Sequence, residues 1–432
     1  MNRLWSTLFW SIIAAAFIGP GTVTTAASAG AGHGYALLWA LGFSTIACLV
    51  LQEAAARLTI VSGDDLGRAI RSRHAEGWRR AAVLGLVLGA IVLGCAAYEA
   101  GNILGGAAGA MLGADLNPRA VTLICGFVAA ALLASGRTAI VTQVLALLVA
   151  VMGATFLYTA WQLGPSLIQA TKGLLLPTFP QGSSLLILGL VGTTVVPYNL
   201  FLGSGLARGQ ELAEMRFGLT CAVLLGGLIS MGVLVVGTAV VGRFGFDTLT
   251  QVLTLELGPA ARKLFGLGLF AAGLSSAITA PLAAAVTARS LFAAGPDDLS
   301  WSNRSWRFGS VWAGVLLVGV AFGLAEVKPV PAILLAQALN GVLLPFVAVF
   351  LMVAVNDPAV MGSERVNGRW ANRWMLPVVA VTLLLGVKGV LSAGAATFGL
   401  PAPGAVWTLV ATVLVVVALR RPLLGTLRGM RL

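Results

Sequence analysis

The sequence predicts an all-α integral membrane protein of about twelve transmembrane helices, arranged as two inverted five-helix repeats with one broken helix in each. The composition is the first observation, because 58% of the 432 residues are hydrophobic, 10% are charged and the mean hydropathy is +0.95. Such a chain is too apolar for a soluble protein. The second observation is a series of long apolar segments, and the third is a pair of segments that a proline interrupts.

Apolar segments of roughly 20 residues, the length that crosses about 30 Å of hydrocarbon, recur along the whole chain. We expect spans at residues 8–31, 35–59, 81–107, 119–136, 138–160, 183–206, 217–241, 263–291, 308–327, 330–355, 375–396 and 402–419. The longest polar connections are 61–80, 290–307 and 356–374, and none is long enough to form a soluble domain. Asp64 and Asp65 in the first of them predict a turn before a short amphipathic helix, and its neighbouring arginines make this loop a candidate cytoplasmic gate.

The net charge of +12 is carried mainly by arginines at the termini and in every second connection. They are Arg3, Arg68, Arg71, Arg73, Arg79, Arg80, Arg137, Arg208, Arg216, Arg304, Arg307, Arg365, Arg369, Arg373, Arg420, Arg421, Arg428 and Arg431. The main exception is the group Arg243, Arg262 and Lys263. This alternation indicates a lipid bilayer and not a nucleic acid as partner, and the positive-inside rule places both termini in the cytoplasm.

Two of the apolar segments are each broken by a polar patch around a proline. The first is Gly19-Pro20-Gly21-Thr22, and the second is Val196-Pro197-Tyr198-Asn199. Proline removes a backbone donor and blocks the carbonyl one turn back, so each helix should unwind inside the membrane and expose amides and carbonyls. Paired interruptions of this kind mark the binding site of a secondary transporter.

The equivalence of the two breaks sets the expected domain organisation. Residues 1–160 would form the first five-helix repeat, 161–360 the second, and 361–432 two appended helices with a basic tail. An odd number of spans per repeat inverts the second repeat, so that the broken helices meet at the centre. The opening residues also fit a secretory signal, but their apolar run is too long for one and cleavage would discard the Gly-Pro-Gly break.

The cysteines and histidines do not predict a cofactor or a metal cluster. All four cysteines lie inside apolar segments without a Cys-x-x-Cys pair, which is typical of packing residues. The two histidines, His33 and His74, are isolated near segment ends. We therefore expect no cofactor.

The motifs around the breaks resemble those of the Nramp (natural resistance-associated macrophage protein) family of divalent-metal transporters. Gly19-Pro20-Gly21-Thr22 and the following Gly-Tyr-Ala-Leu-Leu-Trp at 34–39 are similar to the family's Asp-Pro-Gly-Asn and Gly-Tyr-x-Leu-Leu-Trp. The run Gly-Thr-Thr-Val-Val-Pro-Tyr-Asn-Leu at 192–200 resembles its Gly-Ala-Thr-Val-Met-Pro-His-Asn-Leu. Span eight carries a similar Ala-Gly-Leu-Ser-Ser-Ala-Ile-Thr at 272–279, and span ten carries Gln337 and Leu344-Pro345-Phe346. The resemblance covers spans one to ten and implies the inverted-repeat fold of LeuT/APC type.

The departures from the family pattern fall on its metal ligands. In the family, the Asp and Asn of the first motif and the Met and a backbone carbonyl of the second coordinate the metal. Gly19, Thr22, Val196 and Thr193 stand at those positions here. Tyr198 replaces a histidine that the family links to proton movement. The resemblance therefore implies a transporter whose metal-binding charge and soft sulfur have been lost.

The residues at the breaks favour a small polar or zwitterionic solute over a bare transition metal. Hydroxyls and carbonyls alone compensate a divalent charge poorly, whereas the amides that begin the helix at Gly21 favour an anionic group. The candidate substrate-binding residues are Gly19, Gly21, Thr22, Thr25, Thr193, Val196, Tyr198, Asn199, Gln52 and Gln337. The alternative is a divalent cation, Mn²⁺ or hydrated Mg²⁺, with proton coupling. Glycine packing, capping by Asn199 and amide bonds between helices are the structural alternatives for these residues.

Three residues are candidates for proton coupling or gating. Glu99 and its neighbour Asn102 lie in span three, at positions where the family carries acidic residues, and ionisable groups within spans are costly and usually functional. Glu53 lies one turn before Arg57, so a local ion pair is its alternative role. A proton is thus the candidate coupling ion.

Other function classes fit the sequence less well. The absence of a nucleotide-binding loop argues against a primary pump, and a closed pair of broken helices without an acidic ring argues against a channel. The chain lacks a plausible nucleophile and base, so we do not expect an enzyme. A non-transporting receptor remains the alternative that a flux assay would distinguish.

Overall fold

The computed structural model describes residues 18–73, 77–136, 139–295, 298–363, 365–397 and 403–418. These residues are helical with short connections, and no strand occurs among them. The longer helices are α2 (Pro20–His33), α3 (Leu38–Ser62), α5 (Trp78–Gly113), α6 (Pro118–Ser135), α7 (Ala139–Gln162), α9 (Ser184–Thr194), α10 (Pro197–Leu206), α11 (Leu212–Gly237), α13 (Ala260–Phe292), α14 (Trp306–Leu324), α15 (Pro329–Val355), α17 (Arg369–Thr397) and α18 (Ala405–Ala418).

Short helices fill the connections between the long ones. They are η1 (Gly34–Leu37), α4 (Leu66–Ser72), α8 (Leu167–Leu175), α12 (Phe246–Leu257), η2 (Leu299–Trp301) and α16 (Pro358–Met361). The turn and short helix expected after Asp64 are confirmed, because the carboxylate of Asp65 accepts a hydrogen bond from the backbone N–H of Arg68 and caps α4. The helices α8 and α12 were not foreseen.

The expected number of spans agrees with the structure. Within the described residues, ten helical stretches are long and apolar enough to cross a membrane. One of them, Pro20–Ser62, combines α2 with α3, and α18 contributes a shorter apolar helix, Val406–Val417. The first half of span one, residues 8–17, lies outside the described residues. The protein is therefore a multi-pass integral membrane protein with ten to twelve apolar helices.

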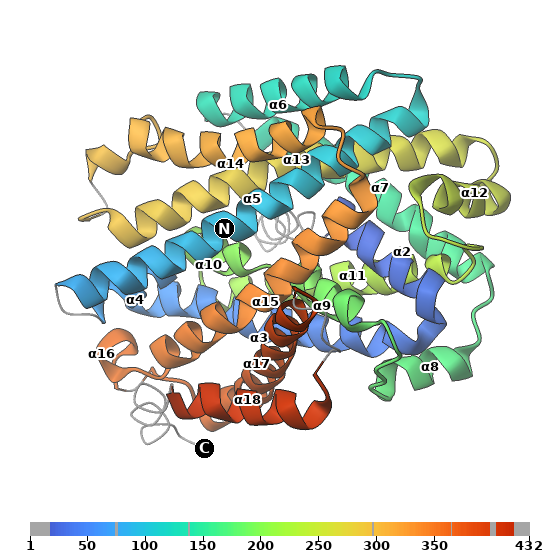
Figure 1. Cartoon of the computed structure of the whole chain (residues 1–432). Coiled ribbons are helices and arrows are strands. Elements are labelled where there is room, and N and C mark those ends of the chain that lie inside the picture. Colours follow the sequence, from blue (N-terminus) through green and yellow to red (C-terminus); the bar gives the residue numbers. More distant parts are fainter. Residues whose placement is uncertain are drawn as a thin grey trace.

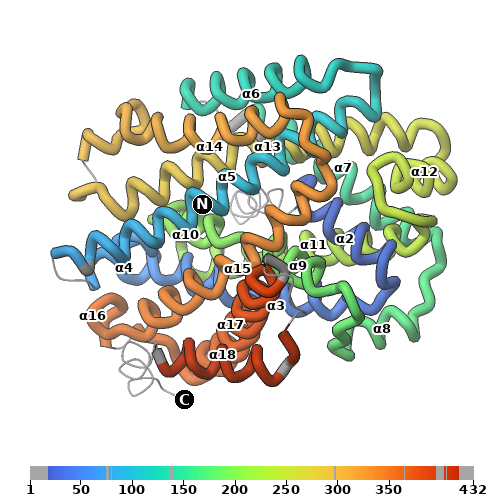
Figure 2. The backbone as a smooth tube through the Cα atoms, in the orientation of Figure 1, coloured from blue at the N-terminus to red at the C-terminus, as the bar shows by residue number. Residues whose placement is uncertain are grey.

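The packing places the two broken segments in the middle of the bundle (Figure 1). Helix α2 packs against α11, α9 and α15, while α10 packs against α3 and α13. Helices α5 and α13 run beside each other over much of their length, as the tube in Figure 2 shows. At the other side, α17 packs on α15 and α18 packs on α17. The breaks are thus enclosed by helices from both halves of the chain.

Close helix contacts around the centre depend on glycine. A Cβ atom on Gly192 would lie 2.0 Å from the carbonyl oxygen of Gln337, and one on Gly237 would lie 2.4 Å from the carbonyl oxygen of Ala27. Both distances are far below van der Waals contact, so only glycine permits these backbones to approach. This is the small-residue packing that membrane helices use.

Candidate functional site

The sixth span is interrupted at the expected proline. Helix α9 ends at Thr194 and α10 begins at Pro197. Between them, Val195 has φ −111° and ψ 79°, and Val196 has φ −78° and ψ 124°, so both have left the helical region. Pro197 occupies the first helical position, where a missing N–H costs nothing. The break therefore presents the carbonyl end of one half-helix and the amide end of another.

The first span begins its helix at Pro20. Gly19 is the N-cap with extended backbone, φ −92° and ψ 177°, and no side chain caps the helix. The first N–H groups of a helix have no intrahelical partner and carry the positive end of its dipole. The start of α2 therefore offers amide donors to the buried space around Gly19.

The two breaks meet through a pair of threonine hydroxyls. Thr22 Oγ1 and Thr193 Oγ1 lie 2.9 Å apart, which is hydrogen-bond distance. Both residues are buried, and they come from α2 and α9, separated by 171 positions in the chain. The expectation that the first and sixth spans approach one another is confirmed, for their described parts, at this contact.

Gln337 of α15 lies directly over the break in span one. A Cβ atom on Gly21 would lie 2.1 Å from Gln337 Nε2, so the amide side chain occupies the space that any larger residue would fill. On the other side of the break, a Cβ on Gly19 would lie 3.2 Å from Ser276 Oγ of α13. The glycines therefore admit two polar side chains to the break.

Two further predicted residues, Gln52 of α3 and Asn199 of α10, have their amide side chains at the half-helix α10. A Cβ on Gly203 would lie 2.6 Å from Gln52 Oε1, so the amide of Gln52 in α3 packs against this half-helix. Asn199 is one turn earlier on α10, and both amide side chains are buried. The N-cap residue of α10, Val196, is buried as well.

Several buried polar atoms around the breaks have no hydrogen-bond partner among the residues that the structure describes. The acceptors are Gln52 Oε1 and Gln337 Oε1, the amide donor is Asn199 Nδ2, and the hydroxyls are Thr25 Oγ1 and Ser276 Oγ. Buried polar groups are normally satisfied, so such a set indicates a place where a ligand or water supplies the missing partners. All five groups are neutral and include both donors and acceptors.

Glu99 is buried in α5, one turn from Asn102. Asn102 Nδ2 donates to Glu99 Oε2 at 3.3 Å, and Glu99 Oε1 has no partner. The adjacent Tyr98 packs edge-to-face on Tyr198 of α10, with ring centroids 5.6 Å apart. Tyr98 thus packs against the second half of span six, whereas the side chain of Glu99 packs against α14, where a Cβ on Gly319 would lie 2.7 Å from Glu99 Cγ.

Glu53 lies elsewhere, in an ion-paired cluster. Arg57 Nε donates to its carboxylate at 3.1 Å, and Arg216 Nη2 of α11 donates at 2.7 Å. The expected local pair with Arg57 is confirmed, and the second guanidinium comes from a distant part of the sequence. Arg57 also donates to Asn367. A gating role of Glu53 stays a prediction.

Two residues outside the predicted set belong to the same region. Ser276 lies in the Ser-Ser motif of span eight, and Tyr98 precedes Glu99, so sequence signals were present for both. Within the described ranges, no group of three or more His, Cys, Asp or Glu side chains is arranged to hold a metal ion. The polar groups at the breaks are therefore suited to hydrogen bonding, and they carry no fixed charge.

A membrane bundle in which an interrupted helix meets the start of another helix at a buried polar centre is typical of a secondary transporter. The sequence pattern described as "Natural resistance-associated macrophage protein-like" (Nramp) matches residues 11–392. The chain belongs to this family.

Curated relatives and solved structures agree with this assignment. The chain is 27% identical over 395 residues to the divalent metal cation transporter MntH of Bacillus subtilis, covering 86% of this chain and 89% of that one. It is 30% identical over 297 residues to MntH of Yersinia pestis, covering 64% and 70%. A manganese transporter from Eremococcus coleocola, solved with an aromatic bis-isothiourea compound, superposes with a TM-score of 0.72 at 21% identity and covers 99% of this chain and 95% of that one. The fold is thus the LeuT-type fold of the Nramp transporters.

Proposed function

We propose that this protein is a secondary-active transporter that carries a small polar or zwitterionic solute through the site at the helix breaks. The observation that carries the proposal is the neutral contact between the breaks, where Thr22 and Thr193 share a hydrogen bond and Gln337 covers Gly21. A bare divalent ion moved into such a site would lose its hydration without gaining a carboxylate, and the desolvation penalty is several kcal/mol. A hydrogen-bonding solute does not carry that cost.

The electrostatics of the half-helices support a ligand with separated charges. The amide end of α2 favours an anionic group, and the carbonyl end of α9 favours a cationic one. A zwitterionic solute could place its carboxylate on the first amides of α2 and its ammonium near the carbonyl end of α9 at Thr193. Both helix ends would then stabilise a charge of the solute. The unpartnered donors and acceptors of Asn199, Gln52 and Gln337 would bind its remaining polar atoms.

The second candidate function is transport of a divalent metal cation. It is favoured by the relatives, whose names describe divalent metal cation transporters. Hydrated Mg²⁺ keeps several of its waters, so it needs fewer direct protein ligands at a neutral site than Mn²⁺ or Fe²⁺. Thr22, Thr193 and Gln337 would then contact the ion through water.

Glu99 is the proposed proton carrier in either case. It is a buried carboxylate inside a membrane-spanning helix, its Oε1 has no partner among the described residues, and the preceding residue, Tyr98, packs against Tyr198 of α10. Asn102 donates to the other carboxylate oxygen and so orients the group. A proton taken up there would link transport to the pH gradient.

The arrangement in the membrane follows from the arginine distribution. We infer that both termini lie in the cytoplasm and that the protein resides in a bacterial inner membrane. Residues 1–160 and 161–360 would form the two inverted repeats, with 361–432 appended. Cysteine-accessibility labelling of loop positions on both faces tests this orientation.

The function is tested by uptake into proteoliposomes that contain the purified full chain. A panel of labelled neutral amino acids, betaines and small carboxylic acids is compared with Mn²⁺ and Mg²⁺ at matched ionic strength. The proposal expects saturable uptake of at least one organic solute, stimulated by an imposed pH gradient, and no saturable uptake of Mn²⁺. Saturable Mn²⁺ uptake with no organic substrate would establish the alternative.

A further inference from the structure

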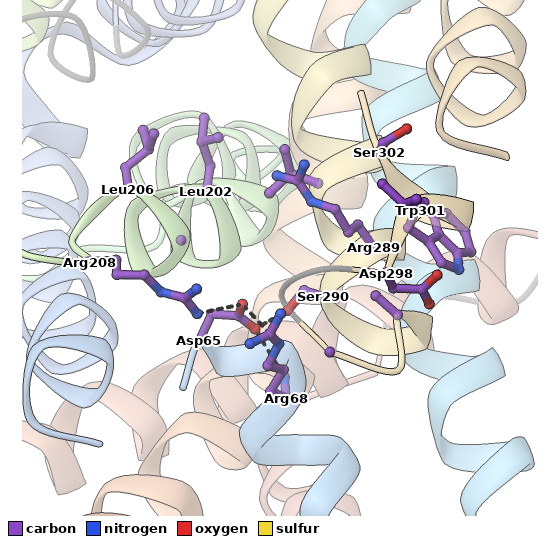
Figure 3. A pocket seen from close by; sticks show the side chains of 15 residues that line it. Asp65, Arg68, Leu202, Leu206, Arg208, Arg289, Ser290, Asp298, Trp301 and Ser302 are labelled. Carbon is purple, nitrogen blue, oxygen red and sulfur yellow. Dashed lines mark hydrogen bonds and ion pairs between the residues drawn. The ribbon is translucent and has the colours of Figure 1, made fainter. Parts of the chain in front are cut away.

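A cavity of about 520 Å³ lies away from the helix breaks, where α4, the end of α10 and the end of α13 meet. Figure 3 shows that three arginines approach it from three different elements. Arg68 comes from α4, Arg208 follows α10, and Arg289 lies in the last turn of α13. From the sequence, Arg68 and Arg208 indicated only membrane topology, Arg68 also belonged to the candidate gate loop, and Arg289 was not singled out.

The arginines keep donors that the protein does not use. Arg68 Nε makes no hydrogen bond although solvent does not reach it. Arg208 donates from Nη2 to the carbonyl oxygen of Gly63 at 3.2 Å, and Arg289 donates from Nη1 to Asn303 Oδ1 at 2.7 Å. Because a guanidinium has five N–H donors, each of these side chains can bind a further acceptor in the cavity.

Asp65 stands between two of the arginines but does not satisfy them. Arg68 Nε and Arg208 Nη2 lie 3.8 Å and 3.9 Å from its Oδ2, beyond hydrogen-bond distance. Its Oδ1 is already used, because it accepts from the backbone N–H of Arg68 and from the hydroxyl of Ser290. The single carboxylate of Asp65 therefore lies near the guanidinium groups of both Arg68 and Arg208 while it also caps the first turn of α4.

The second carboxylate on the cavity wall has its own partners. Asp298 accepts from the backbone N–H groups of Ala294 and Ser300, each at 2.9 Å. These bonds and the nearby Arg307 hold its pKa below the usual range. Among the described lining residues, three guanidinium groups thus face two carboxylates that are both engaged.

We propose that this cavity binds a phosphate-type anion through Arg68, Arg208 and Arg289. Guanidinium groups bind phosphate oxygens by paired, charge-assisted hydrogen bonds. Three of them converging from separate elements suit a tetrahedral group with several oxygens. The cavity volume falls in the range of small-molecule sites, so it accommodates more than the phosphate group itself.

The surroundings favour the headgroup of an anionic phospholipid over a free phosphate. The cavity lies at the ends of two membrane-spanning helices, on the face that the arginines predict to be cytoplasmic. Leu299 and Trp301 line it, and Leu299 is 83% exposed, which suits residues that contact the bilayer interface. Basic pockets between transmembrane helices on that face bind anionic headgroups. The bound group would contact residues of α4, α13 and the end of the half-helix α10 at once.

The test measures the melting temperature of the full chain in lipid nanodiscs. One arm compares phosphatidylcholine discs with discs that also contain phosphatidylglycerol. The other arm adds inorganic phosphate, or chloride at equal ionic strength, to phosphatidylcholine discs. A rise with phosphatidylglycerol assigns the site to a lipid headgroup, and a rise with phosphate alone assigns it to a free anion. No rise in either arm overturns the proposal.

The variants Arg208→Gln and Arg68→Gln locate the effect. Each is expected to lose most of the rise and to weaken the apparent affinity about tenfold, a loss of about 1.4 kcal/mol. Arg304→Gln is the matched control, because Arg304 is exposed on the same face and does not line the cavity. If Arg208→Gln does not fold, Arg208→Lys replaces it in the test. Lysine keeps the charge but loses the planar guanidinium group, so this variant should retain part of the rise in melting temperature. An equal rise in wild type, Arg208→Gln, Arg68→Gln and Arg304→Gln would show a general charge effect and contradict the proposal.

Discussion

Thr22 Oγ1 and Thr193 Oγ1 lie 2.9 Å apart, and this hydrogen bond joins the two broken segments of the bundle at a buried point. By the resemblance to the Nramp family, Thr22 stands at the position of an asparagine ligand, and Thr193 stands where a backbone carbonyl is the ligand. A hydroxyl pair can donate and accept hydrogen bonds but cannot neutralise a divalent charge. We therefore propose that the neutral character of this contact limits which substrates the protein carries.

Replacing Thr193 by valine removes one hydroxyl and keeps the shape of the side chain. We expect the KM for the organic solute to rise by up to about tenfold, because a neutral hydrogen bond contributes about 0.5–1.5 kcal/mol. Thr194→Val is the matched control, since its hydroxyl bonds only to the carbonyl oxygen of Leu190 within α9. Uptake kinetics in proteoliposomes measure both variants. Equal effects at the two positions would indicate a structural role for Thr193.

Gly21→Ala should impair transport by forcing the side chain of Gln337 away from the break. The added Cβ would lie 2.1 Å from Gln337 Nε2, and overpacking of this kind costs about 1–3 kcal/mol. Combining it with Gln337→Ala should recover folding stability but not transport if the amide binds substrate. Gly32→Ala is the control in the same helix, because nothing lies within 4 Å of a Cβ there. Full recovery of transport in the double variant would contradict substrate contact by Gln337.

Glu99→Gln should flatten the pH dependence of transport, because it keeps the shape and removes the proton-binding group. Asn102 would still find an oxygen acceptor at the position of Glu99 Oε2. Uptake is measured over a series of external pH values, with Glu256→Gln as control because Glu256 is exposed on α12. A pH profile in Glu99→Gln that matches the wild type would remove Glu99 from the coupling mechanism.

Asn372→Ala should destabilise the attachment of α17. Asn372 and Asn356 exchange hydrogen bonds at 3.0 Å and 3.1 Å, and Asn367 Nδ2 donates to Asn372 Oδ1 at 2.9 Å. Each buried amide left unpaired costs about 1–3 kcal/mol, so the melting temperature in detergent should fall clearly. Gln251→Ala, at an exposed position of α12, should leave it unchanged. A melting temperature equal to that of the wild type would show that the network contributes little.

The sequence predicted the features that depend on local chemistry. Apolar length located the spans, and the backbone constraint of Pro20 and Pro197 located the two helix starts. The motif resemblance brought Gln337 and Thr193 into one candidate site. These predictions rest on properties of short segments, which sequence displays directly.

The remaining features depend on packing between distant segments. Ser276 reaches Gly19 only because α13 crosses the start of α2, and Arg216 reaches Glu53 across 163 positions. The helices α8 and α12 were too short to be distinguished from connections. The convergence of Arg68, Arg208 and Arg289 on one cavity likewise requires three separate helices to be placed in space.

Calorimetric titration of Mn²⁺ into the purified wild-type protein tests the central claim most directly. A variant that restores the family's ligands, Gly19→Asp with Thr22→Asn and Val196→Met, is titrated beside it. The account predicts no binding heat in the wild type and measurable binding in the restored variant, because only the latter supplies a carboxylate and a thioether. Micromolar Mn²⁺ binding by the wild type would contradict it.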